Sequence, residues 1–153
     1  MAYTKALYEI IDEVRKSKNV KIKAEILKNH ESTALIDLLQ LTYNPGIKWL
    51  LPEGVPPYTP AEGTTEDGEG TDLEGALIGK MRMMKYFISV DGNVIENIKP
   101  AKREVVFIQL LETVAPKDAK LVLEMKTGAL KGVSTGVVQK AFRQIQTKVF
   151  STL

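Results

Sequence analysis

Hydrophobic side chains recur at spacings of three and four along most of the chain, which is the pattern of helices that bury one face. Leu7, Ile10, Ile11 and Val14 form the first such face. Helices are predicted over about 5–16, 20–29, 35–43, 73–90, 100–114, 116–127 and 134–146. The predicted fold class is therefore all-α, a compact multi-helix bundle in a single domain, residues 1–153.

Short segments between these helices give finer predictions. The apolar segment IKWLL, residues 47–51, is predicted as a helical turn packed on the core. The pair Asp91-Gly92 is predicted as a turn; it could also join a hairpin, but the residues that follow are few and polar for a strand. Further core positions are predicted at Ile22, Ile26, Leu27, Val105, Ile108, Leu110, Leu111, Leu121, Leu123 and Met125.

Residues 52–72 differ from the rest of the chain in composition. They hold four of the seven prolines, and residues 53–75 carry seven acidic side chains and no Lys or Arg. Such a segment buries too little apolar surface to offset its chain entropy, so one long acidic loop is predicted here. Residues 117–153 are the opposite, with seven basic residues against two acids. The net charge of +2 therefore hides a local basic field that favours a polyanionic partner.

The residues needed for most enzymes and metal sites are missing. The chain has no cysteine and one histidine, His30, which is predicted as a capping or surface residue. The acids of the loop lack the order of a calcium-binding loop, and there is no phosphate-binding Walker motif. We therefore predict no catalysis, no metal and no cofactor. No apolar run approaches the ~20 residues of a membrane span, and the absence of cysteine fits a cytoplasmic location.

The segment LEMKTGALKGVSTGVVQKAF, residues 123–142, contains the candidate functional site. Gly128 can end one helix, Gly132 lets the backbone approach a bulky group, and Ser134 or Thr135 can cap the next helix. A helix that begins there directs free amides outward, which suits phosphate. The lysines in and beside this corner are Lys126, Lys131 and Lys140. The residues alone leave two interpretations open, a phosphate-binding corner and an ordinary helix–turn–helix corner with solubilising lysines.

The same segment resembles the end of the N-terminal DNA-binding domain of ATP-dependent DNA ligases, especially the tailed-phage type. That family has a Gly turn followed by a helix with the pattern small–small–apolar–small–polar–Lys–apolar–aromatic, and GVSTGVVQKAF at 132–142 is similar. The opening segment 6–51 resembles the start of that domain, most closely in LLQLTYNPGI at 38–47. The resemblance therefore covers nearly the whole chain.

The resemblance implies a non-catalytic, phage-encoded relative of this domain that binds double-stranded DNA through its phosphate backbone. The ligase nucleophile lies in a Lys-x-Asp-Gly motif, and Ser89 stands where that lysine would precede Asp91-Gly92. We therefore expect a freestanding domain without a nucleotidyltransferase domain. The implied nucleic-acid-binding residues are Lys126, Lys131, Gly132, Val133, Ser134, Thr135 and Lys140, with Lys21, Lys23 and Lys48 from the N-terminal part.

An alternative function uses the same fold without DNA. The chain could be a protein-binding adaptor, a virion component or a DNA mimic whose acidic loop contacts a host or phage nucleic-acid enzyme. Recovery of partners that resists nuclease would favour this alternative. Neither hypothesis involves a membrane.

Overall fold

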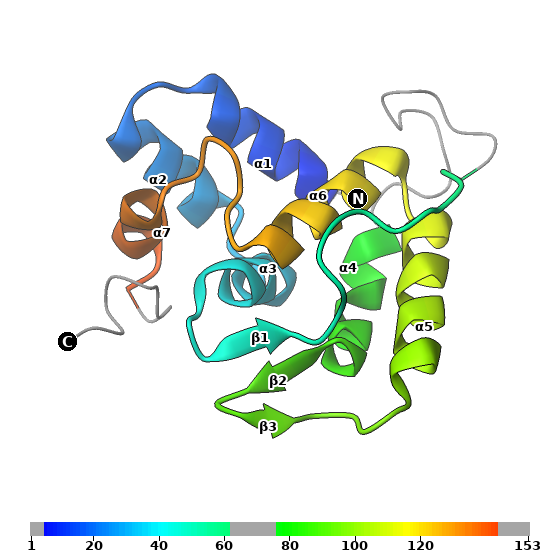
Figure 1. The fold of residues 1–153 in the computed structure, drawn as a ribbon. Helices are drawn as coiled ribbons and strands as arrows, with labels where there is room; N and C mark the ends of the chain where they lie inside the picture. Colours follow the sequence, from blue (N-terminus) through cyan, green and yellow to red (C-terminus); the bar gives the residue numbers. More distant parts are fainter. Residues whose placement is uncertain (1–4, 62–75, 144–153) are drawn as a thin grey trace. The chain divides into compact units, whose positions relative to one another are not determined.

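Seven α-helices and one 3-10 helix make up most of the secondary structure in the computed structural model, which describes residues 5–61 and 76–143 (Figure 1). The helices are α1 (Leu7–Lys16), α2 (Val20–Asn29), α3 (Thr33–Tyr43), α4 (Ala76–Lys80), η1 (Met81–Tyr86), α5 (Pro100–Thr113), α6 (Pro116–Thr127) and α7 (Thr135–Ala141). A three-stranded sheet accompanies them, formed by β1 (Ile47–Trp49), β2 (Ile88–Val90) and β3 (Asn93–Val94). The prediction of a mainly helical fold is confirmed, and the prediction that it is purely α-helical was wrong.

The chain forms two compact units. The first comprises Met1–Pro45 and Glu124–Leu153, and the second comprises Gly46–Leu123. The boundary falls inside α6, whose last turn belongs to the first unit. The single domain over residues 1–153 stays a prediction.

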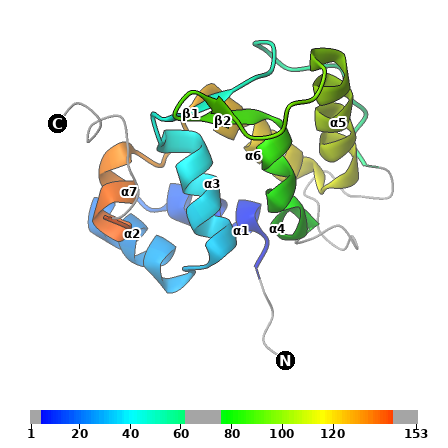
Figure 2. The ribbon, with the colours of Figure 1, turned by 90° about the horizontal axis from the view of Figure 1, so that it is seen from below.

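The first unit is helical, and α2 packs against both α1 and α7 (Figures 1 and 2). The predicted face of α1 is confirmed, because all four of its apolar residues are buried. Asn19, Ser32 and Ser134 precede α2, α3 and α7, and each side-chain oxygen accepts a hydrogen bond from a backbone amide of the first turn. These caps fix where three of the helices begin.

The last predicted helix is shorter than its pattern indicated. Helix α7 ends at Ala141, because Phe142 takes an extended conformation (φ −136°, ψ 91°) and buries its ring. Residues 144–146 of the predicted helix lie outside the described residues. The end predicted for α6 is confirmed: the helix stops at Thr127, and Gly128 follows with a φ of 90°.

The second unit contains the sheet, which the sequence analysis did not predict. Strand β1 pairs antiparallel with β2, and β2 pairs antiparallel with β3. The segment predicted as a helical turn at 47–51 thus begins with a strand. Asp91 and Gly92 have φ values of 51° and 84°, as a two-residue hairpin turn requires. The Asp-Gly pair was therefore a hairpin signal, and the helix predicted over 73–90 is replaced by α4, η1 and β2.

Aromatic rings form the centre of the second unit. Phe87 stacks on Trp49 with ring centroids 6.5 Å apart and meets Phe107 edge-on at 5.2 Å. The buried Arg103 guanidinium donates to the carbonyl of Tyr86, which ties α5 to the end of η1. The predicted burial of two residues was wrong, because Val105 of α5 is 50% exposed and Ile22 of α2 is 48% exposed.

Candidate nucleic-acid interface

An open hollow of about 430 Å³ lies in the first unit, beside the segment that joins α6 to α7. Its lining comes from α2, the end of α3, the joining segment and the start of α7. The residues that line it are Val20, Lys23, Tyr43, Gly128, Ala129, Leu130, Gly132, Val133, Ser134, Thr135 and Val137. The hollow therefore coincides with the corner that the sequence analysis selected.

The joining segment folds back on itself in a tight turn. Leu130 and Val133 form an isolated antiparallel bridge, and the amide of Val133 donates to the carbonyl of Leu130 at 3.0 Å. Lys131 and Gly132 are the two central residues of this turn. Gly132 has a φ of 80°, the positive value that the third position of such a turn can require.

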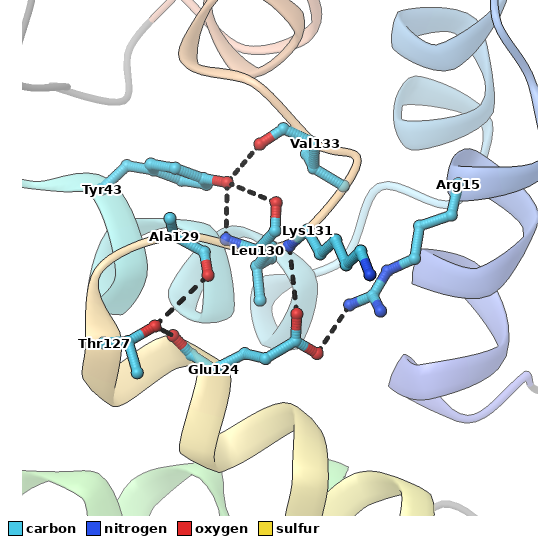
Figure 3. Close-up of polar contacts among 8 residues, drawn as sticks. All are labelled: Arg15, Tyr43, Glu124, Thr127, Ala129, Leu130, Lys131 and Val133. Atoms are coloured by element: carbon cyan, nitrogen blue, oxygen red, sulfur yellow. Dashed lines mark hydrogen bonds and ion pairs between the residues drawn. The ribbon is translucent and has the colours of Figure 1, made fainter. Parts of the chain in front are cut away.

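Tyr43 holds this turn from the end of α3 (Figure 3). Its hydroxyl accepts from the amide of Leu130 at 2.9 Å and donates to the carbonyl of Val133. The carbonyl of Leu130 lies 3.4 Å from the same hydroxyl. Burial raises the pKa of this phenol above its ordinary value, so it stays protonated and can keep donating.

Glu124 in the last turn of α6 holds the other side of the turn (Figure 3). One carboxylate oxygen accepts from the amide of Lys131 at 3.0 Å, and the other pairs with the guanidinium of Arg15 at 2.8 Å. This carboxylate therefore joins the turn to α1. Its negative charge is compensated by Arg15, so it does not cancel the lysines nearby.

Glycine is needed at position 132 for a second reason. A Cβ built on Gly132 would lie 3.0 Å from the Cγ of Arg15, closer than real Cβ atoms normally approach a neighbour. From the sequence, Gly132 was expected to let a bulky group approach from outside. The close neighbour is instead a side chain of α1 within the same unit.

Lys23 gives the hollow a fixed positive charge. Its Nζ donates to the carbonyl of Gly132 at 2.7 Å, and no carboxylate is among the described residues that line the hollow. Ser134 adds a hydroxyl that accepts from the amide of Val137 at 3.2 Å and retains its own proton for an acceptor. Thr135 adds a second hydroxyl to the lining. An ammonium and hydroxyls without a carboxylate suit an anion.

The comparison with known families places the chain. A family model described as a family of unknown function, DUF6433, matches residues 10–132. The chain belongs to DUF6433. No curated protein and no solved structure matches it. The matched residues of this DUF6433 protein run from the first turn of α1 to Gly132, the last central residue of the tight turn.

The structure of this DUF6433 protein brings together five of the ten candidate residues. These are Lys23, Gly132, Val133, Ser134 and Thr135. Lys21, Lys126, Lys131 and Lys140 belong to the same unit but do not line the hollow. Lys21, Lys131 and Lys140 are exposed, and Lys126 is partly exposed. Lys48 is an exposed residue of β1 in the other unit.

The prediction of bare backbone amides is wrong for three residues of the corner. The amides of Lys131 and Val133 donate to Glu124 and to the carbonyl of Leu130, and the amide of Val137 donates to the hydroxyl of Ser134. These three donors are not free for an anion. Lysine side chains and hydroxyls are further polar groups of the corner that suit an anion.

The residues that shape the hollow were not among the predicted site residues. Tyr43 and Val20 line it, and Arg15 and Glu124 fix its turn, yet none was a candidate. Tyr43 stood inside the quoted LTY motif, but its partners lie 87 and 90 residues away along the chain. A pattern of neighbouring residues cannot predict a contact across that distance in the sequence.

The described residues contain no group of three or more His, Asp or Glu side chains that could hold a metal ion. The acidic residues between 62 and 75 lie outside these residues. None of the described helices is long and apolar enough to cross a membrane.

Proposed function

We propose that this DUF6433 chain is a non-catalytic module that binds duplex DNA without reading its sequence. Lys23 with the hydroxyls of Ser134 and Thr135 holds one phosphate at the rim of the hollow, and Lys131 and Lys140 hold neighbouring phosphates. The sequence resemblance to the DNA-binding domain of phage-type ATP-dependent DNA ligases supports this function, and with it a phage origin and action in the host cytoplasm.

The observation that carries the proposal is the ammonium of Lys23. It is fixed by the carbonyl of Gly132 at 2.7 Å, in a hollow that no carboxylate lines within residues 5–61 and 76–143. A cation that is already held in place but not neutralised loses less conformational entropy when it binds a phosphate than a mobile cation does.

The charge of the whole first unit supports the same proposal. Residues Met1–Pro45 and Glu124–Leu153 hold twelve Lys and Arg against seven Asp and Glu, a formal charge of +5. A net positive charge attracts a polyanion, and base edges play no part in that attraction. Binding is therefore expected to be non-specific and to weaken as salt rises.

Charge reversal tests the proposal. Lys131→Glu with Lys140→Glu is expected to weaken binding of a fluorescent blunt duplex about tenfold or more, because two phosphate contacts become repulsive. The matched control is Lys99→Glu with Lys102→Glu, two exposed lysines of the second unit. Circular dichroism checks that all proteins keep their helices.

Two results would overturn the proposal. One is equal affinity of the two double variants, and the other is no binding of duplex by the unmodified protein at low salt. The second result would leave a protein-binding adaptor as the remaining function.

A further inference from the structure

The hollow has two chemically different parts. Its floor is apolar and consists of Leu130, Val133 and Val137, with Val20 of α2 at one edge. The rim carries Lys23 and the hydroxyls of Ser134 and Thr135. A site that only touches a phosphate backbone has no need of a recessed apolar floor, because phosphates lie on the outside of a duplex.

The size of the hollow also exceeds what one phosphate needs. About 430 Å³ falls within the range of sites for small organic ligands. A ligand that matches both parts must combine a flat or apolar body with an anionic group. A nucleotide has this composition, since its base offers an apolar face and its phosphate a negative charge.

We propose that the hollow receives a single unpaired nucleotide, with its base at Val20 and its phosphate at Lys23 and Ser134. This inference rests on the proposed function and adds that the preferred DNA has an unpaired nucleotide. A strand end or a nucleotide extruded from the duplex presents the same chemistry as a free mononucleotide, and the experiments below distinguish these sources.

The first experiment compares three fluorescent duplexes of equal length by anisotropy. One is blunt, one has a three-nucleotide overhang, and one has the same overhang without bases. The overhang with bases is expected to bind about fivefold to tenfold more tightly than the other two, since only this duplex can bury an apolar base face against aliphatic side chains. Equal affinity for all three, or an advantage that the abasic overhang keeps, would overturn the inference and leave duplex binding intact.

The second experiment places a charge at the apolar edge of the hollow. Val20 is 51% exposed at the first position of α2, so Val20→Glu adds a carboxylate there without displacing a buried side chain. The matched control is Ile22→Glu, which adds the same charge on the same helix, at a residue that is 48% exposed and outside the lining. Val20→Glu is expected to abolish the overhang advantage, whereas Ile22→Glu is expected to keep it. Equal overhang advantages in the two variants would contradict the inference.

The third experiment titrates a deoxynucleoside 5′-monophosphate into the isotope-labelled protein and follows the amide signals of residues 128–137 by NMR. Shifts confined to these residues in the unmodified protein, and absent in Val20→Glu, show that a free nucleotide is sufficient. An overhang advantage without such shifts assigns the site to a strand end. If the protein binds no DNA, the proposed function fails, and the absence of shifts then overturns this inference as well.

Discussion

The two units of the chain differ in charge and in what stabilises them. The first unit carries a formal charge of +5, whereas the second holds nine Lys and Arg against twelve Asp and Glu, a formal charge of −3. The turn of the first unit is held by polar bonds from Tyr43 and Glu124 to backbone groups. The second unit is centred on the rings of Phe87, Phe107 and Trp49.

This difference separates binding from stability. Polar bonds that converge on a backbone turn fix its shape, and a net positive charge around it attracts an anion. Aromatic packing contributes mostly apolar burial and places no charge at the surface. We therefore expect substitutions in the aromatic cluster to change stability alone, and substitutions at the turn to change DNA affinity as well.

The largest effect is expected from Phe107→Ala. The ring is 2% exposed and touches both other rings of the cluster, so its loss should lower the free energy of unfolding by about 3–5 kcal/mol. Chemical denaturation measures the change, and Val105→Ala on the exposed face of the same helix serves as control. If the folded fraction of Phe107→Ala also lost DNA affinity, the separation of binding from stability would be wrong.

Tyr43→Phe is expected to cost about 1–3 kcal/mol of unfolding free energy, because the amide of Leu130 and the carbonyl of Val133 lose their buried partner. The cost should depend on pH. The pKa of the Tyr43 phenol is raised above its ordinary value of 10.0, so this stability is present below pH 10 and is lost as pH rises through the folded pKa.

Denaturation of both proteins at pH 7 and at pH 11 measures that dependence. The unmodified protein should lose more stability over this range than Tyr43→Phe. If the difference in unfolding free energy between the two proteins is the same at both pH values, the Tyr43 hydroxyl is not the source of the pH dependence. Weaker duplex binding by Tyr43→Phe is expected too, because the turn that fixes Lys23 loses its support.

A pair of glycine substitutions tests the turn more finely. Gly132 and Gly92 have almost equal positive φ values of 80° and 84°, so alanine should cost each about 1–2 kcal/mol of backbone strain. Only at Gly132 would the new Cβ also meet the Cγ of Arg15, at 3.0 Å, whereas nothing lies within 4 Å at Gly92. Gly132→Ala should therefore be the more destabilising of the two by thermal denaturation, and a reversed order would contradict the described contact.

The smallest effect is expected at Glu13. The hydrogen bond from Lys5 lowers the pKa of its carboxyl, and His30 lowers it further. The small contribution of the Lys5–Glu13 ion pair to stability is therefore present above the ordinary pKa of the carboxyl. It is lost as pH falls through the lowered pKa of the folded protein. Lys5→Met should raise the Glu13 pKa toward its ordinary value, and an NMR titration measures this change. An unchanged Glu13 pKa would show that the ion pair is not formed in solution.

Local signals in the sequence were sufficient for most helices. Pro100 and Pro116 begin α5 and α6 as predicted, since proline suits the first turn of a helix. The sheet was missed because β1 and β2 have only three residues each, too few to show an alternation of apolar and polar side chains. The two strands also pair across about 40 residues, so no local pattern indicates their pairing. Only the Asp91-Gly92 turn carried a local signal for it.

The candidate site was predictable only in the part that local sequence signals mark. The glycines and hydroxyls from Gly128 to Thr135 are neighbours in the sequence, so the corner could be selected from its pattern. The hollow depends on Lys23 and Tyr43, which meet this corner across 109 and 87 residues. Only the fold brings them together.

The salt dependence of duplex binding tests the central claim most directly. If Lys23, Lys131 and Lys140 each neutralise one phosphate, the slope of log K against log salt should be about −2.7, and Lys131→Gln should make it less negative by about 0.9. Lys102→Gln in the second unit should leave it unchanged. Identical slopes for the unmodified protein and Lys131→Gln, or no dependence on salt, would contradict the claim that this turn and its lysines bind the phosphates of DNA.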